Sequence, residues 1–515
     1  ELIVMLNKGV QAEKISSQFF QVNGNPSGIF LDKTLSDLSN IHLFVFDHQS
    51  IDENEMLAAV RSHRGVRAAQ FNHYVQDRAT LPNDPSIATQ WHHVDASDND
   101  IDSDLAWDIT TGGTTANGDD IVVCIIEGGG SNYNHVDLIA NHWTNPNEVD
   151  NNGVDDDGNG FVDDFNGWNP TNNTDNISAG GHGTAVSGMI GAKGNNNNGG
   201  SGVNWDVKLM QVMIGSLNES NVIAAYNYPY TQRNLYNITA GANGAFVIAT
   251  NASWGIDNAN PANYPVWCAY YDDLGQVGIL NCGATANNNV NIDVVGDMPT
   301  GCSSDYMVAV TATNSSDVRT FSGYGATTID LGAPGESVYL PSGSTGYSST
   351  SGTSFASPCV AGAIAMVYSS PCPDLAATAL VNPQLAADQV RSYILNGVDP
   401  VANLTGECVT GGRLNVRNAI DLALSNCGPL PPCNPIDLTL TAECAYNSQT
   451  SSVEGTITLD VTMSEAFCSV ETVCYIPSGG ALTCEDLSVG GVLLTNANTF
   501  TLTGLLSNTS YEVYY

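Results

Sequence analysis

Ile121-Val122-Val123-Cys124-Ile125-Ile126 is the stretch that decides the fold class, because it is an apolar run with no polar break. A strand with one solvated face alternates apolar and polar residues, whereas a strand buried on both faces reads as a continuous apolar run. Short runs of the same kind recur at 207–213, 246–252, 277–280 and 306–311, with segments of small residues between them. This alternation predicts an α/β fold with a mostly parallel sheet flanked by helices. Cys124 is then a small buried apolar side chain rather than a disulfide partner.

Breaks in the pattern predict three domains. Residues 1–84 mix strand-like runs with an amphipathic stretch at 53–61 and end in the turn-rich Leu81-Pro82-Asn83-Asp84-Pro85, so we expect a small α+β domain there. Residues 85–426 carry the α/β pattern. After a proline-rich segment, Thr/Val/Leu alternation predicts an all-β module over 427–515. Its last segment looks like the closing strands of a fibronectin-type or immunoglobulin-like sandwich, cut short at Tyr515.

Composition excludes several classes of function. The 515 residues carry 14 Lys and Arg against 53 Asp and Glu, a net charge of −39, so binding to nucleic acid or to an anionic membrane surface is not expected. No apolar run reaches the length of a transmembrane helix. The first 80 residues are nearly neutral, with 7 basic and 9 acidic residues, while the remainder holds 7 against 44. The N-terminal domain and the body are therefore electrostatically distinct.

Cysteine usage and the N-terminus indicate the compartment. There are thirteen cysteines, an odd number, and a dense set lies near the C-terminus: Cys427, Cys433, Cys444, Cys468, Cys474 and Cys484. Such density is typical of an oxidising environment. The first six residues read as a strand without a basic region before it, so we expect that a signal peptide is absent from this sequence. The sequence thus predicts an extracellular protein, secreted or attached to the cell surface.

A serine stands at a chemically favourable place in Ser351-Gly352-Thr353-Ser354-Phe355-Ala356-Ser357-Pro358. The segment lies between a glycine-rich loop and a run of small apolar residues that predicts a buried helix. Ser354 is then at or near the helix N-terminus, where unpaired N–H groups and the helix dipole favour a developing oxyanion. Taken alone, the same pattern also fits a serine that only caps a helix.

A histidine begins a second helix of small residues, in Gly181-His182-Gly183-Thr184-Ala185-Val186-Ser187-Gly188. Together, the two segments resemble the subtilisin-like serine protease family, whose His block reads HGT-x-V-x-G and whose Ser block reads GTS-x-A-x-P. The resemblance spans roughly residues 85–426, and it departs at Cys359, where a histidine commonly follows the proline. It implies that His182 and Ser354 are catalytic.

The resemblance also implies an amide that stabilises the oxyanion, in the turn after an apolar strand. We assign this role to Asn287 in Ala284-Thr285-Ala286-Asn287, where the family motif is altered. If the motif is aligned in another register, the donor is Asn281, Asn288 or Asn289. A further alternative is that the segment is an Asn-rich turn with no catalytic role.

Asn251-Ala252-Ser253-Trp254-Gly255 resembles the family's substrate strand, whose backbone pairs with an extended peptide. Ser253, Trp254 and Gly255 would then line the specificity pocket, with an apolar wall and no obvious charge selector. A tryptophan buried in the core is the alternative for Trp254.

The acid that orients His182 is expected where the run at 121–126 ends. The family has an aspartate there, and this sequence has Glu127. Active sites of parallel sheets lie at the carboxyl ends of the strands, and Asp120 is at the other end, about 23 Å away at 3.3 Å per residue. The alternative is Asp137, which sits in a segment similar to the family's H-x-D-L turn, whose aspartate has a structural or metal role.

An acidic loop predicts a structural calcium ion. Asp155-Asp156-Asp157-Gly158-Asn159-Gly160-Phe161-Val162-Asp163-Asp164 has the spacing of the start of a calcium-binding loop, with glycine at the sixth position. The expected ligands are Asp155, Asp157, Asn159, Phe161 and Asp163. Asn166 stands where a bidentate glutamate would complete the site, so Asp164 or Asp150 is expected to contribute. Without a cation, the loop is an ordinary solvated turn with mutually repelling carboxylates.

These features predict a secreted serine endopeptidase that cleaves a polypeptide substrate through an acyl-enzyme. By the same resemblance, residues 1–84 are a pro-domain that inhibits the enzyme intramolecularly and is processed near Tyr74–Thr80. The order acid, His, Ser matches this family, whereas an α/β-hydrolase would need a G-x-S-x-G elbow and the order Ser, acid, His. The alternative is a catalytically dead homologue that acts as an adhesion or structural extracellular protein.

Overall fold

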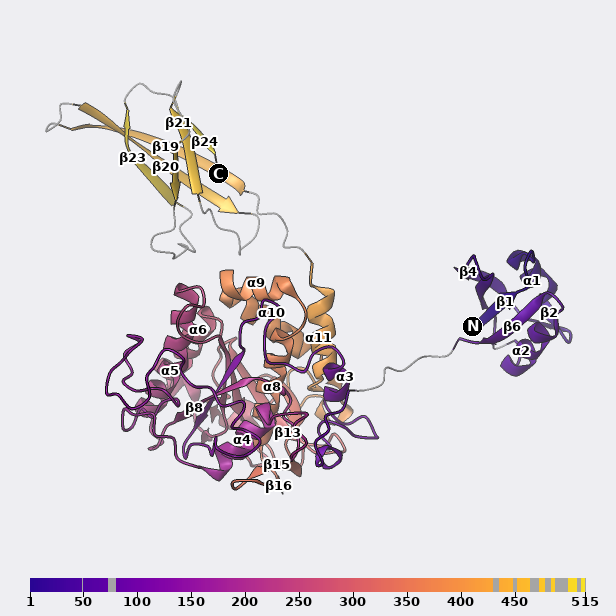
Figure 1. The fold of residues 1–515 in the computed structure, drawn as a ribbon, viewed down its shortest axis with the longest axis horizontal. Helices are drawn as coiled ribbons and strands as arrows, with labels where there is room; N and C mark the ends of the chain where they lie inside the picture. Colours follow the sequence, from indigo (N-terminus) through magenta and orange to yellow (C-terminus); the bar gives the residue numbers. More distant parts are fainter. Residues whose placement is uncertain are drawn as a thin grey trace. The chain divides into compact units, whose positions relative to one another are not determined.

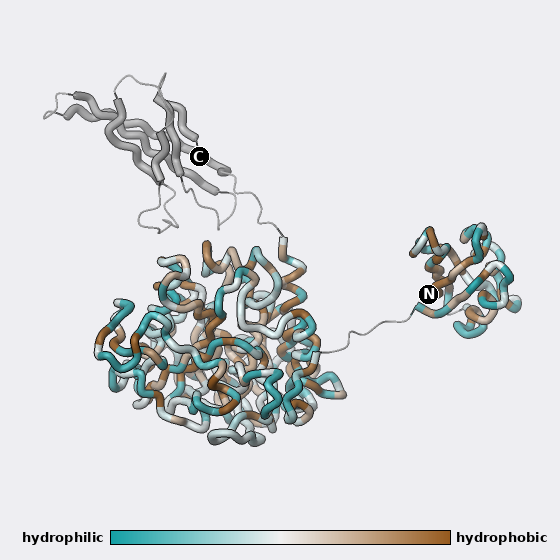
Figure 2. The backbone as a smooth tube through the Cα atoms, in the orientation of Figure 1, coloured by the Kyte–Doolittle hydropathy of each residue, from teal (hydrophilic) through white to brown (hydrophobic). Residues whose placement is uncertain are grey.

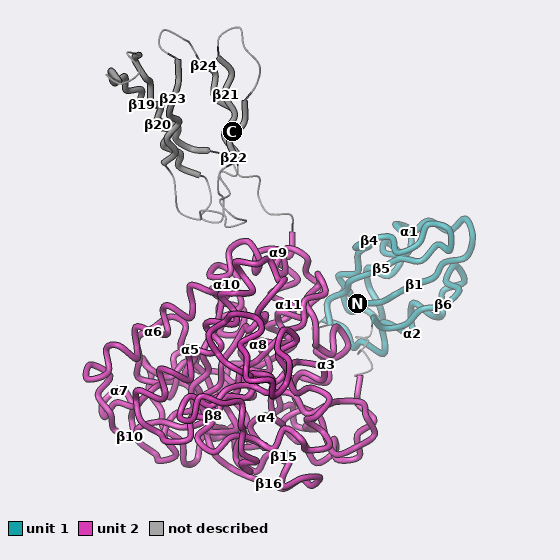
Figure 3. Tube along the Cα trace, turned by 60° about the vertical axis from the view of Figure 1, so that its left-hand side comes forward, with its two compact units in different colours: residues 1–78 teal, residues 79–515 magenta. Residues whose placement is uncertain are grey.

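In the computed structural model, the apolar run at 121–126 becomes β7 (Val122–Glu127), one strand of an eight-stranded sheet. Residues 1–48, 50–72 and 80–428 are described in full, and six later strands are described by their backbone alone. The chain divides into two compact units, residues 1–78 and 79–515, which Figure 3 distinguishes by colour. Each unit is treated by itself below.

Unit 1 is an antiparallel sheet with strand order β4-β5-β1-β6 and two helices. A two-stranded ribbon, β2–β3, accompanies the sheet. Ile15 of α1 and Met56, Leu57 and Val60 of α2 share a buried core with alternate residues of β1. Asp52 caps α2 by accepting the Asn54 and Glu55 N–H groups at 3.0 Å. The elements are β1 (Leu2–Leu6), α1 (Ala12–Gln18), β2 (Gln21–Val22), β3 (Asn25–Pro26), β4 (Phe30–Ser36), β5 (Ile41–Val45), α2 (Glu53–Ser62) and β6 (Val66–Phe71).

The large sheet of unit 2 has the order β17-β18-β14-β13-β11-β9-β7-β8 and is parallel except for the edge pair β17–β18. The predicted α/β class with a mostly parallel sheet is therefore confirmed. The other strands of this sheet are β8 (Lys208–Met213), β9 (Val247–Ala252), β11 (Leu280–Ala284), β13 (Met307–Thr313), β14 (Leu331–Pro334), β17 (Asp399–Pro400) and β18 (Gly412–Arg413).

Helices cover both faces of the sheet (Figure 1). Val123 and Ile125 of β7 belong to the core shared with α4 and α8, whereas Val122, Cys124 and Ile126 belong to the core shared with α5 and α6. Every residue of β7 is thus buried, as the continuous apolar run predicts. The helices are α3 (Ser103–Trp107), α4 (Gly181–Gly191), α5 (Glu219–Ile238), α6 (Pro265–Gln276), α7 (Ile292–Val295), α8 (Thr353–Tyr368), α9 (Pro373–Val381), α10 (Pro383–Asn396) and α11 (Val416–Ser425).

Small ribbons complete the fully described part of unit 2. β10 (Ile256–Asp257) pairs with β12 (Asp297–Met298), and the hairpin β15 (Val338–Ser342) and β16 (Gly346–Thr350) leads into α8. Three short 3-10 turns are Ile87–Thr89, Pro261–Asn263 and Ala402–Leu404. Figure 2 shows apolar and polar segments alternating along the chain of this unit.

The helices of the described residues include none that is long and apolar enough by itself to cross a membrane. Among the described helices, the pair α8 and α9 is long and apolar enough for a membrane span when taken together, but the two helices are bent by 105° relative to each other.

The C-terminal residues form strands whose side chains are not described. The strands make two three-stranded sheets, β19-β20-β23 and β22-β21-β24. Their bounds are β19 (Pro435–Asn447), β20 (Ser452–Met463), β21 (Thr472–Pro477), β22 (Thr483–Asp486), β23 (Thr499–Leu506) and β24 (Tyr511–Tyr514). The assignment of residues 427–515 to a sandwich, and of residues 1–84 to a pro-domain, stays a prediction.

Disulfides join Cys268 to Cys302 and Cys372 to Cys427. Cys124 is buried and unbridged, which confirms its predicted role as a small apolar side chain. The other cysteines of the predicted C-terminal set lie outside the described side chains.

Candidate active site

Glu127 and His182 meet at the carboxyl end of β7. His182 Nδ1 donates to Glu127 Oε2 at 2.9 Å. The Glu127 side chain is 5% exposed and that of His182 is 47% exposed, so the acid is sealed from solvent while the imidazole is reachable from outside. The hydrogen bond to Glu127 raises the pKa of His182, with burial opposing it. Burial raises the pKa of Glu127, and the His182 hydrogen bond opposes that change.

Glycines allow the loop after β7 to pack closely on the start of α4. A Cβ at Gly183 would lie 2.2 Å from the Gly130 carbonyl oxygen and 3.1 Å from Glu127 Cγ. Gly130 itself has a φ of +71°, which side chains other than glycine rarely adopt. The longer acid is therefore accommodated because the helix approaches it without a side chain at position 183.

Ser354 is the second residue of α8 and is largely buried. Its Oγ donates to the Ser253 carbonyl at 3.2 Å, and among the described residues it makes no hydrogen bond to His182. The His182 ring lies 5.7 Å, centroid to centroid, from the ring of Phe355, the residue that follows Ser354 in α8. Catalytic hydrogen bonds are often loose until substrate binds.

Asn287 lies against the residue that precedes Ser354. Its side chain accepts the Thr353 N–H at 2.9 Å and the Thr353 hydroxyl at 3.1 Å. A backbone N–H only donates, so the atom facing it is Oδ1, and Nδ2 points away from this contact. Within the described ranges, no hydrogen bond is formed by Nδ2, which lies beside the N-terminus of α8.

The three alternative asparagines have other partners. Asn281 is buried in β11, where its Oδ1 accepts from Thr250 and its Nδ2 donates to backbone carbonyls. Asn288 donates to Asp257 at 3.3 Å, and Asn289 accepts from Arg319 at 2.7 Å. Of the four candidates, Asn287 is the one with a described hydrogen bond to α8, the helix that carries Ser354.

A chain of hydrogen bonds, which sequence reasoning missed, ties the end of β9 to α8. Ser357 donates to Asn251 Oδ1 at 2.7 Å, Asn251 Nδ2 donates to Ser253 Oγ at 2.9 Å, and Ser253 Oγ donates to the Ser354 carbonyl at 2.7 Å. All four residues are buried. The spacing of Ser354 and Ser357 on one helix face was the only available signal, since the partners lie about a hundred residues away.

The predicted pocket residues follow β9 directly. Ser253 is buried in the chain of hydrogen bonds just described. Trp254 is half-buried, donates its indole N–H to the Ile126 carbonyl at 2.6 Å and packs beside Trp267. Gly255 is exposed, and a Cβ there would lie 2.3 Å from the Met298 carbonyl. The indole is therefore held against the sheet by a hydrogen bond as well as by packing.

Asp137, the alternative triad acid, lies in a different network. It is fully buried, and its carboxylate accepts from Asn196 at 2.6 Å, from Asn198 at 3.1 Å and from the Tyr347 hydroxyl. Among the fully described residues, no contact joins it to His182. Its partners indicate a structural role for this carboxylate.

The acidic loop forms a carboxylate cluster with a composition that differs from the predicted ligand set. Oxygen atoms of Glu148, Asp157 and Asp164 lie within 4.8 Å of one another. Asp164 is completely buried, and burial raises its pKa to about 6. Glu148 Oε2 is buried without a hydrogen-bond partner. An oxygen-rich site with an unsatisfied buried carboxylate oxygen fits a hard cation such as Ca²⁺.

Only some of the predicted calcium ligands lie in this carboxylate cluster. Asp157 belongs to the cluster, and Asn159 donates to both Asp157 and Asp164 at 3.0 Å. Asp155 accepts the N–H groups of Asn159 and Gly160. Asp163 instead accepts the N–H groups of Asn152 and Gly153, and Phe161 packs its ring against Trp168 and Tyr228. Glu148 was missed because it precedes the motif.

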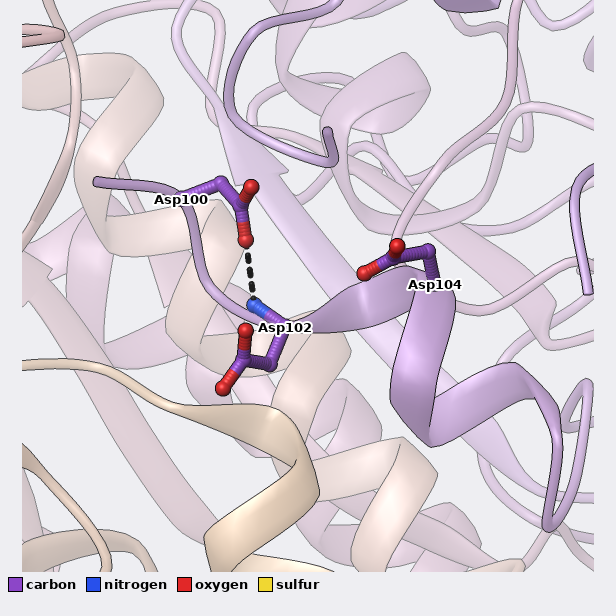
Figure 4. A group of neighbouring side chains, drawn as sticks. All are labelled: Asp100, Asp102 and Asp104. Atoms are coloured by element: carbon purple, nitrogen blue, oxygen red, sulfur yellow. Dashed lines mark hydrogen bonds between the residues drawn. The ribbon is translucent and has the colours of Figure 1, made fainter. Parts of the chain in front are cut away.

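In a second acidic group, Asp100, Asp102 and Asp104, two of the carboxylates have hydrogen-bond partners within the protein (Figure 4). Asp100 accepts the Asp102 N–H at 2.7 Å, and Asp102 accepts from Asn415 at 2.6 Å. These contacts hold the turn before α3.

Comparison with known proteins adds independent information. The sequence profile of the subtilase family matches residues 118–411, more than half of the chain. The chain is 28% identical over 330 residues to Subtilisin-like protease 1 of Plasmodium berghei, covering 59% of this chain and 50% of that protein. It is 30% identical over 334 residues to the Extracellular protease of Xanthomonas campestris, covering 61% and 53%. The chain thus spans about half the length of these curated relatives. A solved protease from Pseudoalteromonas arctica has a TM-score of 0.49 at 20% identity, covering 67% of this chain and 100% of that one.

Proposed function

The chain belongs to the subtilase family, and from this premise we propose that it is a serine endopeptidase that hydrolyses peptide bonds through an acyl-enzyme. The hydrogen bond between His182 Nδ1 and Glu127 Oε2 carries the proposal. It fixes the tautomer in which Nε2 holds a free lone pair, and this is the form needed in a general base.

Glu127, His182, Ser354 and Asn287 each take part in the proposed reaction. Ser354 Oγ turns from the Ser253 carbonyl toward His182, attacks the peptide carbonyl and gives its proton to Nε2. The imidazolium, stabilised by Glu127, passes that proton to the leaving amine as the C–N bond breaks. Asn287 Nδ2 and the Ser354 N–H donate to the oxyanion. Water repeats the sequence to release the acid and restore Ser354.

A dead homologue with an adhesive or structural role is the second candidate, favoured by the Ser354 hydrogen bond to Ser253 in place of one to His182. A fluorophosphonate probe distinguishes the two candidates, because it reacts only with an activated serine. We expect the processed protein to be labelled and Ser354→Ala to stay unlabelled. A processed, folded parent that resists the probe contradicts the protease proposal.

Unit 1 is proposed as an inhibitory pro-domain. It has its own buried core, and the side chains of Phe20, Phe30 and Leu38 are exposed. We expect residues 80–515 produced without unit 1 to yield less native protein, and added unit 1 to inhibit the mature enzyme. Removing residues 73–78 from the added unit, a segment outside the described residues, is expected to weaken the inhibition. Equal folding yield together with no inhibition would disprove this role.

A structural calcium ion is proposed at Glu148, Asp157 and Asp164, with the rest of the acidic loop around it. Because a ligand that binds only the folded state stabilises it, a hundredfold excess over Kd adds about 2.7 kcal/mol to the free energy of unfolding. Chelation should therefore lower Tm, and Asp157→Asn should abolish the gain on adding Ca²⁺. The exposed Asp272→Asn serves as the matched control and should keep it. An unchanged Tm after verified metal removal refutes the site.

Secretion is also proposed. It is supported by the two disulfides and by the name of the Xanthomonas campestris relative, an extracellular protease.

A further inference from the structure

Two aspartates face each other next to the proposed substrate strand. β10 and β12 form a two-residue antiparallel ladder in which Asp257 stands directly opposite Asp297. Residues directly opposite in such a ladder project from the same face, with Cβ atoms about 4.5–5.5 Å apart. Like charges at this spacing destabilise the pair, and a cation bound between the two carboxylates would relieve that repulsion.

Asp297 lacks such compensation within the protein. Its side chain is 1% exposed, Oδ2 accepts from the Thr300 hydroxyl, and Oδ1 has no hydrogen-bond partner. Burial, with a contribution from Asp257, raises the pKa of Asp297 to about 7. In the described part of the chain, no lysine or arginine forms an ion pair with either acid. A buried carboxylate oxygen left in this state is costly unless a ligand satisfies it.

The acid pair lies between the two segments that flank Ser354. On one side, the Ser253 carbonyl accepts from Ser354 Oγ, and Asp257 follows four residues later. On the other side, Asn288 follows Asn287 and donates to Asp257 Oδ2 at 3.3 Å, while its own Oδ1 is buried without a partner. The close approach of Gly255 to the Met298 carbonyl holds the ladder against the substrate strand.

We propose that Asp297 and Asp257 select a basic side chain, lysine or arginine, at the residue whose carbonyl Ser354 attacks. The proposal rests on the protease function proposed above and specifies its substrate class. A carbonyl held between Ser354 and Asn287 directs its own side chain into the space between residues 253–257 and 287–288. Asp257 and Asn288 belong to these segments, and Asp297 stands opposite Asp257 on the ladder. We assign their oxygen atoms as the acceptors of this site, a set that matches the several donors of a guanidinium or ammonium group.

The kinetic test uses peptides that differ only at the cleaved residue: arginine, its neutral isostere citrulline, or phenylalanine. We expect kcat/KM to favour arginine over citrulline by about 100-fold or more, since a site built for a charged donor rejects the analogue that lacks the charge. Asp297→Asn and, separately, the more exposed Asp257→Asn should reduce that ratio to within about tenfold. Asp273→Asn, on the exposed face of α6, should leave it unchanged. Circular dichroism and Tm establish that each variant is folded.

A binding test separates this proposal from the protease proposal. Benzamidine, a cationic amidine, should raise the Tm of Ser354→Ala, whereas neutral benzamide should not. Adding Asp297→Asn should remove the benzamidine effect. If both benzamidine results are obtained but the parent cleaves no peptide and does not react with the probe, the cation-binding site is supported and the protease proposal fails.

The opposite outcomes overturn the site. Cleavage of arginine and citrulline peptides at equal rates by a labelled enzyme leaves the protease proposal intact and refutes basic selection. Basic selection is also refuted if benzamidine does not raise the Tm of Ser354→Ala. Stabilisation by Ca²⁺ alone, lost in Asp297→Asn, would assign the acid pair to a metal instead.

Discussion

Glu127→Gln is expected to lower kcat/KM by about 10⁴-fold on an unstructured peptide, the scale of the loss when a triad acid loses its charge. Glutamine occupies the same space, but its carboxamide neither stabilises the imidazolium nor enforces donation from His182 Nδ1. Because the charge contributes during proton transfer, the loss should appear mainly in kcat.

The same variant should change the pH profile. Catalysis needs neutral His182, so activity appears as the pH rises through the pKa of that imidazole. Glu127 raises this pKa, and its replacement by glutamine should move the acid limb of the residual activity to lower pH.

Asp137→Asn is the control for both the kinetic constants and the pH profile. It should lower Tm through the contacts to Asn196, Asn198 and Tyr347 while leaving the acid limb in place. Full activity in Glu127→Gln would show that the acid lies elsewhere.

Asn287→Ala is expected to lower kcat by about 10²–10³-fold with little change in KM. This is the effect of removing one oxyanion donor in subtilisin, a member of the same family. The reason is that the lost hydrogen bond strengthens only as charge develops on the carbonyl oxygen. Steady-state kinetics on one peptide measure both constants.

Asn289→Ala is the matched control, because its amide serves Arg319 rather than the nucleophile helix. Its kcat should stay within about threefold of the parent, since losing a partly exposed hydrogen bond costs little. If Asn289→Ala loses activity and Asn287→Ala keeps it, the register assigned to this loop is wrong.

The sequence predicted the parts of the molecule that depend on local pattern. The apolar run at 121–126 identified a strand buried on both faces, and the motifs around His182 and Ser354 located the starts of α4 and α8. The expected position of Glu127 at the strand end also agrees with its contact to His182. The strand followed from periodicity, whereas the roles of Glu127, His182 and Ser354 rested on the resemblance to the subtilisin-like family together with the rule for parallel sheets.

Contacts between residues that are far apart in the sequence could not be predicted from local pattern. Asp257 and Asp297 meet only because two strands of two residues pair, and such short strands carry no periodic signal. Glu148 joins the acidic cluster from outside the loop motif. Asn251 connects Ser357 to Ser253 across the boundary between the sheet and a helix. In each case a polar side chain finds its partner through the fold rather than through neighbouring sequence.

The anchoring of Asn287 on Thr353 has a mechanical consequence. Because its carbonyl oxygen is held by the N–H and hydroxyl of the residue directly before Ser354, the amide donor and the nucleophile are fastened to the same turn of α8. A displacement of that turn carries both groups together and preserves the distance between them. His182 sits on α4, which packs against α8 in the same buried core, so its distance from this pair depends on the packing of two helices rather than on a hydrogen bond. If the proposed mechanism holds, we therefore expect adjustment on substrate binding at the junction between α4 and α8, which the proton would cross.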